Sequence, residues 1–294
     1  MASWAKDAPN RGCTDSRGLS TLLHRFTRAG VLFAITAIAL LVCYAPALRG
    51  MAEQWFTDED MGHGFLVPLV IVWIIWRERD QWRTLPTAPS LWGLALLLAG
   101  ALLQCISVLG AGLFAACLGL LITIVGVVLC LGGVAFLRRS AFLFVLSLFM
   151  LPKLAIVYQR TLPLELLASH LAAGVLSFAG VGVVREGNIL SVGGHRVLVA
   201  EACNGLRYLL PLGFVALLLG YLAQSRLWMR VALFLSAIPL AIGGNAIRVA
   251  VSACFPALSQ GAPHSIGGWS IFVLCLIALV VLRRLFESVN ALYA

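Results

Sequence analysis

Long apolar runs, separated by short polar or basic stretches, repeat along almost the whole chain. The first run covers residues 30–48 and follows a polar, basic stretch over residues 1–29. Further runs cover residues 64–76, 91–109, 112–136, 141–151, 206–223, 228–251 and 268–282. Because a transmembrane helix needs about 20 apolar residues, this pattern predicts about eight transmembrane helices. No small-residue cleavage site ends the first run, so we interpret it as a retained helix.

One long segment, about residues 152–205, interrupts this pattern and is too long for a simple connection. Its first part, Leu162–Ala179, places polar side chains among leucines and alanines and predicts an amphipathic or re-entrant helix. Its second part holds two short runs, 188–192 and 196–200, joined through Gly193–Gly194, which is a hairpin signal. We expect an insertion on the outer membrane surface with one helix and a small β-hairpin.

The composition agrees with a membrane protein and excludes a soluble enzyme. Of the 294 residues, 61% are apolar and 11% are charged, and the mean hydropathy is +0.99. The predicted class is an all-α polytopic membrane protein. We divide the chain into a basic N-terminal tail (1–29), one transmembrane domain (30–286) and a short C-terminal tail (287–294).

The net charge of +9 comes from 21 Lys+Arg against 12 Asp+Glu. In the eight-helix topology, most of the basic residues lie in the tails and in the short loops on one side of the membrane. The positive-inside rule then places both tails in the cytoplasm. The basic residues are topology signals, so we expect no nucleic-acid partner.

Three groups of polar residues fall at the predicted outer ends of apolar runs, where such residues are costly and often functional. Cys203 precedes the run 206–223, and the positive end of a helix dipole favours a thiolate. Arg207 lies four positions later, hence on the same helical face, and its positive charge would add to the same effect. Asn245 and Arg248 share a face near the outer end of the run 228–251.

The third group contains His264, which precedes the last apolar run and can exchange protons near neutral pH. The topology places Cys203, Arg248 and His264 on one membrane face. This combination predicts nucleophilic catalysis, in which a thiolate attacks a carbonyl and a histidine protonates the leaving amine. The arginine would stabilise the oxyanion or orient the substrate backbone.

Two other classes of protein fit part of this pattern. A transporter or export component for polysaccharide or lipid would use Arg248 and Arg207 to bind an anionic substrate. A membrane scaffold would leave Cys203, Arg248 and His264 as a packing, an anchoring and a solvated residue. The absence of a visible inverted repeat and the clustering at one face favour an enzyme, and the thiol reactivity of Cys203 distinguishes the classes.

Four sequence blocks resemble the exosortase/archaeosortase family and occur in that family's order. They are DMGHGFLVPLVIVWIIWRER (60–79), EACNGLRYLLP (201–211), GNAIRVAVSA (244–253) and HSIGGWSIF (264–272). The resemblance implies a transmembrane cysteine protease or transpeptidase with Cys203 as nucleophile, Arg248 as stabilising arginine and His264 as general acid/base. Asn204 stands where many relatives have serine.

The resemblance also implies substrates and a location. The substrates would be membrane-anchored proteins with a C-terminal PEP-CTERM-type sorting signal, made of a short motif, a transmembrane helix and a basic tail. The enzyme would lie in the bacterial inner membrane, with its active site on the periplasmic face. Proteins of exopolysaccharide assembly are possible further partners.

We expect several polar residues to support this site or to bind substrate. They are Glu201, Asn204, Arg207, Asn245 and His63. Glu201 could orient His264 or pair with an arginine, and His63 could contact substrate or be structural. Isolated histidines such as His170 and His195 predict no metal site, and cysteine acyl chemistry requires no cofactor.

Overall fold

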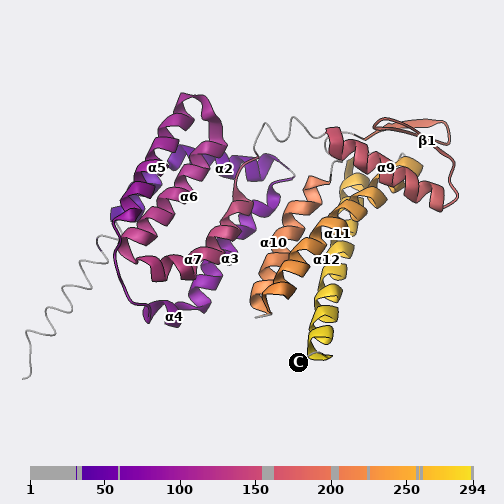
Figure 1. Cartoon of the computed structure of the whole chain (residues 1–294). Coiled ribbons are helices and arrows are strands. Elements are labelled where there is room, and N and C mark those ends of the chain that lie inside the picture. Colours follow the sequence, from indigo (N-terminus) through magenta and orange to yellow (C-terminus); the bar gives the residue numbers. More distant parts are fainter. Residues whose placement is uncertain are drawn as a thin grey trace, which may run out of the picture. The chain divides into compact units, whose positions relative to one another are not determined.

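A computed structural model describes residues 31, 35–58, 60–153, 162–199, 205–223, 226–255, 258 and 261–292. The chain divides into two compact units, residues 1–48 and residues 49–294. Most of the described residues are helical (Figure 1). The predicted sites Glu201, Cys203 and Asn204 lie outside the described residues.

The elements before the insertion are all helical. They are α2 (Ala45–Thr57), η1 (Gly62–Phe65), α3 (Leu66–Arg77), α4 (Arg79–Arg83), α5 (Trp92–Ile106), η2 (Ser107–Ala111), α6 (Gly112–Leu131), α7 (Val134–Ser147) and η3 (Leu148–Met150). The later elements are α9 (Leu162–Phe178), β1 (Val183–Glu186), β2 (Ile189–Val192), β3 (His195–Leu198), α10 (Leu206–Leu222), α11 (Leu227–Cys254) and α12 (Gly261–Leu292).

The apolar runs coincide with helices where they are described, which supports a polytopic membrane protein. The number of eight spans is not confirmed. Three helical segments are long and apolar enough to cross a membrane, namely Trp92–Leu131, Leu227–Cys254 and Gly261–Leu292. A fourth is reached if the broken pair Ile35–Cys43 and Ala45–Thr57 counts as one. Other helices are too short: α3, for example, is about 18 Å long against a hydrocarbon core of about 30 Å.

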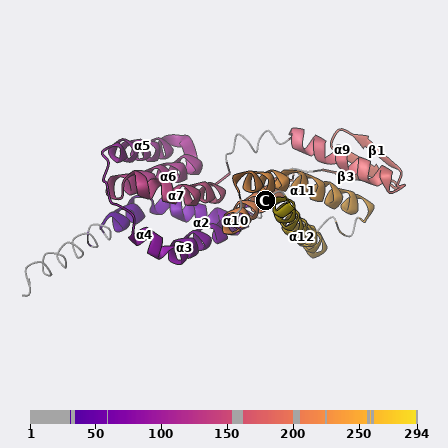
Figure 2. The same cartoon turned by 60° about the horizontal axis from the view of Figure 1, so that its bottom comes forward.

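The segment Trp92–Leu131 is a helical hairpin. This agrees with the sequence analysis, which divides it into two apolar runs between residues 109 and 112. Its turn uses Gly110 and Gly112, whose φ values of +125° and +78° lie in the region that favours glycine. Helices α5 and α6 lie side by side in both views (Figures 1 and 2). A Cβ atom at Gly100 would lie 2.1 Å from Thr123 Oγ1, so only glycine permits this close approach.

Helices α3, α7 and α10 meet in one apolar cluster and one polar cluster. The buried apolar side chains are Val67, Ile74, Leu143, Leu146 and Phe214. At the α3–α4 junction, Glu78 forms an ion pair with Arg139 and accepts a hydrogen bond of 2.5 Å from Tyr221 Oη. Charged groups in an apolar setting are tolerated when they are paired in this way.

The predicted β-hairpin is confirmed and is part of a larger sheet. Strands β2 and β3 are antiparallel and connected by Gly193–Gly194, with φ values of +56° and +83°. A third strand, β1, pairs antiparallel with β2, so the sheet order is β1-β2-β3. One face of the sheet is buried against α9 and α11.

The predicted helix in the insertion is confirmed as α9. Unlike an amphipathic helix of a soluble protein, it exposes apolar side chains. Its buried side carries Ala168, Ala172, Leu176 and Ser169. Ser169 Oγ donates a 2.9 Å hydrogen bond to the Gly187 carbonyl. Its exposed side carries apolar side chains, namely Leu162, Leu164, Leu166, Leu167, Val175 and Phe178. An exposed apolar face fits a helix that contacts lipid.

Helices α10, α11 and α12 form a bundle that positions the candidate site (Figures 1 and 2). Its core contains Tyr208, Leu212, Ala216, Leu233, Ala237, Ala241, Cys275 and Leu279. A Cβ atom at Gly244 would lie 2.6 Å from Cys275 Sγ. This glycine therefore allows α11 and α12 to approach closely one turn before Arg248.

The helical hairpin provides a stability test. We expect Gly100→Ala to destabilise the protein by about 1–3 kcal/mol, because the added methyl group overlaps Thr123. Gly174→Ala in α9, where a Cβ atom meets nothing within 4 Å, should stabilise by about 0.5–1 kcal/mol. Thermal unfolding in detergent micelles measures both variants. An unfolding midpoint of Gly100→Ala equal to that of the wild type would contradict the close approach of α5 and α6.

Candidate active site

Arg248 is a buried cation near the end of α11. The residue is 3% exposed and lies among buried apolar neighbours such as Ala246 and Val249. Among the described residues, no carboxylate forms an ion pair with it. A buried charge is costly unless it is paired, so this position calls for a functional explanation.

The structure brings Arg248 and His264 together. Arg248 Nη2 lies 2.7 Å from His264 Nε2, and His264 Nδ1 lies 3.1 Å from the Leu258 carbonyl oxygen. A guanidinium group can only donate hydrogen bonds, and a carbonyl can only accept them. His264 Nε2 is therefore the acceptor, and Nδ1 carries the proton of a neutral imidazole.

Tyr208 at the start of α10 fixes the guanidinium group from a third helix. The residue is 3% exposed, and Arg248 Cζ lies 5.7 Å from its ring centroid, a cation–π distance. Tyr208 Oη donates a 3.3 Å hydrogen bond to the Gly268 carbonyl in α12. Sequence reasoning missed Tyr208, although it directly follows Arg207 in the block 201–211.

Gly268 leaves space in front of the guanidinium group. A Cβ atom there would lie 3.5 Å from Arg248 Nε and 3.4 Å from Tyr208 Oη. Arg248 Nε and Nη1 have no hydrogen-bond partner among the described residues. Within the described part of the chain, these two buried guanidinium nitrogens can therefore donate to an oxygen acceptor, an arrangement that stabilises negative charge well.

Asn245 places the start of α10 near this pair. Asn245 is buried one turn before Arg248, and a Cβ atom at Gly205 would lie 3.5 Å from its Nδ2. Gly205 is the N-cap of α10, with φ +88°. Helix α10 therefore begins at Leu206. That Cys203 and Arg207 share one helical face stays a prediction, because Cys203 lies outside the described residues. Arg207 is half-buried in the first turn of α10.

His63 lies in a different environment, in η1. Its Nδ1 is 3.2 Å from the Asp60 carbonyl oxygen, and burial lowers its pKa below 6.5, opposed by hydrogen bonds to Phe149 and Asp60. A lowered pKa means that His63 stabilises the fold in its neutral form, and this stability is lost as the pH falls below about 6.5. These contacts include neither Arg248 nor His264.

Two acidic residues beside His63, Asp58 and Asp60, share an ion pair with a lysine that sequence reasoning missed. Lys153 Nζ lies 2.7 Å from an Asp58 oxygen and 2.6 Å from an Asp60 oxygen. In the described part of the chain, no group of three or more His, Cys, Asp or Glu could hold a metal ion. His170 and His195 are both exposed.

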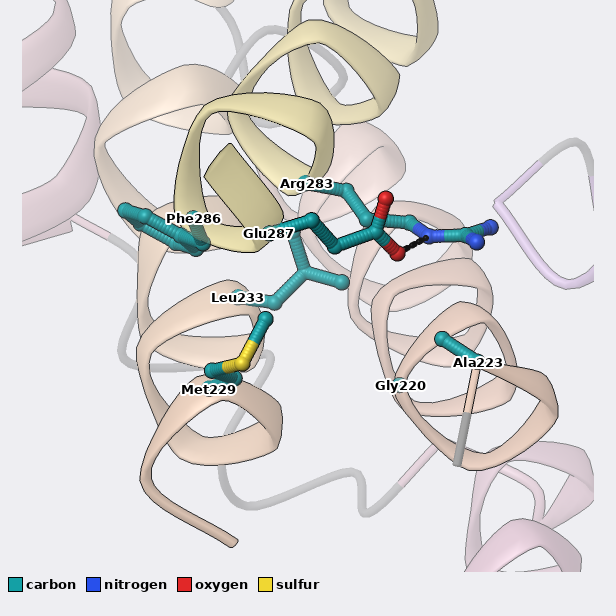
Figure 3. Close-up of a pocket in the computed structure, with 7 residues that line it drawn as sticks. All are labelled: Gly220, Ala223, Met229, Leu233, Arg283, Phe286 and Glu287. Atoms are coloured by element: carbon teal, nitrogen blue, oxygen red, sulfur yellow. Dashed lines mark hydrogen bonds and ion pairs between the residues drawn. The ribbon is translucent and has the colours of Figure 1, made fainter. Parts of the chain in front are cut away.

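A small cavity lies at the opposite end of the same helix bundle (Figure 3). It is lined by Gly220, Ala223, Met229, Leu233, Arg283, Phe286 and Glu287, and Arg283 Nε donates a 2.8 Å hydrogen bond to Glu287. Its volume of about 10 Å³ holds a single water at most. Leu233 precedes Arg248 by about 22 Å of helix. This cavity is therefore separate from the Arg248–His264 pair and too small for a substrate.

These features define a class: a helical membrane protein with a buried, hydrogen-bonded Arg–His pair at one end of a three-helix bundle. The family model described as transmembrane exosortase matches residues 55–281, and the chain belongs to this family. Family membership confirms the resemblance seen in the sequence and supports a membrane sorting transpeptidase in general. Comparison with curated proteins and with solved structures finds no match.

The hydrogen bonds of His264 provide a spectroscopic test. We expect ¹⁵N NMR of histidine-labelled protein in micelles at neutral to mildly basic pH to show a protonated Nδ1 and an unprotonated Nε2. His264→Gln assigns the signal by removing it, and Arg248→Met should shift the Nε2 resonance because the donor is lost. A His264 signal with its proton on Nε2 would exclude the Arg248–His264 hydrogen bond.

Proposed function

We propose that this protein is a membrane-embedded cysteine transpeptidase or protease that cleaves C-terminal PEP-CTERM-type sorting signals from exported proteins. Cys203 is the nucleophile, His264 carries the proton and Arg248 stabilises the oxyanion. The observation that carries this proposal is the buried Arg248–His264 pair, in which two guanidinium N–H groups have no partner among the described residues.

The residues provide a complete acyl-transfer cycle. The Cys203 sulfur forms a bond to the scissile carbonyl carbon, and its proton passes to His264 Nε2 as Arg248 Nη2 moves its hydrogen bond from that nitrogen to the forming oxyanion. The carbonyl oxygen becomes an oxyanion that accepts hydrogen bonds from Arg248. The C–N bond then breaks, and the leaving amine takes the proton from His264. Water, an amine or a hydroxyl group attacks the resulting thioester and releases Cys203.

Chain connectivity supports the role of Cys203. Cys203 precedes Gly205 by two positions, and two residues of chain reach at most about 7 Å. Gly205 lies against Asn245, one turn from Arg248. This connectivity supports our proposal that Cys203 acts on the same substrate carbonyl as Arg248 and His264.

The neighbouring polar residues have supporting roles in this proposal. Asn245 and Arg207 flank the start of α10, where they would orient the nucleophile loop or the substrate backbone, together with Glu201 and Asn204. His63 is a structural residue or a more distant substrate contact. No metal or cofactor takes part in this chemistry.

The proposed location is the bacterial inner membrane, with both termini in the cytoplasm and the site at the periplasmic face. The start of α10, the end of α11 and the start of α12 all contribute to the site, as such a topology requires. Exposed apolar residues beside the pair, Ile266 and Trp269, suit lipid or a membrane-anchored substrate. Proteins of exopolysaccharide assembly are the further partners we propose.

A second candidate is an export component for polysaccharide or lipid with an anion site at Arg248. The buried cation without a carboxylate partner among the described residues favours it as well. This candidate requires Arg248 but has no use for a reactive thiol. Unchanged export after Cys203→Ala would favour it over the enzyme.

The test of the proposed function is co-expression with a substrate that carries a tripartite C-terminal signal. Cys203→Ala, Cys203→Ser, Arg248→Ala and His264→Ala should each lower processing at least about 100-fold, because each removes one participant in acyl transfer. Mass spectrometry of the new C-terminus distinguishes hydrolysis from transfer. The exposed His170 provides a control, and His170→Ala should process normally. Normal turnover by Arg248→Ala or His264→Ala would contradict the assignment.

The adjacent glycines of α12 provide a matched pair of variants. Gly268→Ala should reduce processing about tenfold or more, because the methyl group fills the space in front of Arg248 Nε. At Gly267 a Cβ atom meets nothing within 4 Å, so Gly267→Ala should stay within about twofold of the wild type. Initial processing rates measure both, with protein levels compared by immunoblot. Equal processing rates of Gly268→Ala and Gly267→Ala would show that the substrate does not occupy the space beside Arg248 Nε.

A further inference from the structure

Strand β3 has an open edge in the described part of the chain. The sheet order is β1-β2-β3, so β2 is paired on both sides and β3 is paired on one. An unpaired edge exposes backbone N–H and C=O groups, which can pair with another extended chain. The sheet thus offers a position for a fourth strand.

The hydrogen-bond pattern identifies the backbone groups that face this edge. The Val199 N–H donates a 2.8 Å hydrogen bond to the Asn188 carbonyl of the neighbouring segment. Backbone groups of an antiparallel strand alternate between its two edges, so Val197 also faces β2. Arg196 and Leu198 therefore direct their N–H and C=O groups to the open edge, and both side chains are exposed.

The open edge of β3 lies on the side of the candidate site. Strand β1 packs on α9, whereas β3 packs on α11. The buried residues of the sheet share one apolar cluster with Val249 and Ala250, which directly follow Arg248. Chain order agrees with this placement, since Cys203 follows Leu198 by five positions, at most about 18 Å of extended chain.

The sheet is held in place by polar contacts at the turn between β1 and β2. Asn188 Nδ2 donates a 3.1 Å hydrogen bond to Glu165 in α9, and Arg185 Nη1 donates one of 2.9 Å to the Gly187 carbonyl. Ser169 Oγ, which is fully buried, donates to the same carbonyl. A fixed edge requires little ordering when a peptide binds, which favours binding.

We propose that the substrate segment on the exported side of the scissile bond binds to β3 as a fourth strand. This inference rests on the proposed function. Strand addition fixes a peptide through its main chain and holds it extended, which presents the next carbonyl to the nucleophile. The sheet packs on the C-terminal part of α11. At this position it can receive the exported segment while the anchoring helix of the substrate stays in the bilayer.

The experiment is site-specific photo-cross-linking in the Cys203→Ala background, which retains uncleaved substrate. Benzoylphenylalanine replaces Leu198 on β3 or Val184 on β1, two outward-facing positions with nearly equal exposure, 59% and 60%. The probe is the tripartite-signal substrate that the wild-type enzyme processes. We expect cross-links from Leu198 to exceed those from Val184 at least about fivefold and to map just before the scissile bond.

Hydrogen exchange tests the backbone pairing itself. Substrate binding to Cys203→Ala should slow amide exchange of Arg196 and Leu198 at least about tenfold, whereas the Val197 amide, already bonded within the sheet, should change little. This readout needs no substitution in the sheet.

The outcomes separate this inference from the proposed function. Equal cross-linking from Leu198 and Val184, or cross-links between two copies of the chain, overturns strand addition while cleavage by the wild type upholds the enzyme. Cross-links from Leu198 without any Cys203-dependent cleavage support docking and refute the chemistry. Unchanged exchange at Arg196 and Leu198 in a cross-linked complex overturns main-chain pairing.

Discussion

The arrangement of the C-terminal half depends on one constraint, a guanidinium group buried in an apolar bundle. Arg248 is held by His264 from α12 and by the ring of Tyr208 from α10. Neither partner is negatively charged, so the positive charge is not neutralised among the described residues. Such a cation is costly to bury, and an incoming oxygen anion would lower that cost. Binding energy is then gained as negative charge develops, which is the condition for catalysis.

Small residues make this arrangement possible. Gly244 brings α11 close to α12, and Gly268 leaves room beside the guanidinium group. The same device joins α5 and α6 at Gly100. In a bilayer, where lipid competes with every apolar contact, close backbone approach provides the packing that holds helices together. The helix bundle and the site therefore depend on the same kind of residue.

Hydrophobic periodicity predicted the helices and the membrane class, and the Gly193–Gly194 pair predicted the hairpin correctly. The number of spans was not predictable from apolar runs alone, because several helices are shorter than the bilayer core. Strand β1 was missed because it shows no apolar alternation and its last two residues, Arg185 and Glu186, are charged, although the Gly187–Asn188 pair before β2 is itself a turn signal.

The topology of the apolar runs predicted Cys203, Arg248 and His264 on one membrane face, and the structure brings Arg248 and His264 into contact. The helical face expected for Cys203 and Arg207 stays a prediction, since Cys203 lies outside the described residues and α10 begins directly after the left-handed Gly205. Tyr208 was beyond prediction, because its ring meets Arg248 only through the packing of α10 on α11 and α12. Local patterns therefore predicted the elements, whereas contacts between helices define the site.

The central claim is that Cys203 acts with the Arg248–His264 pair through a covalent intermediate. The most direct measurement is mass spectrometry of the enzyme, quenched with acid during turnover of a tripartite-signal substrate. We predict an adduct on Cys203 whose mass equals the exported part of the substrate in thioester linkage, absent in Arg248→Ala. Processing that continues without any adduct and persists in Cys203→Ala would contradict the account.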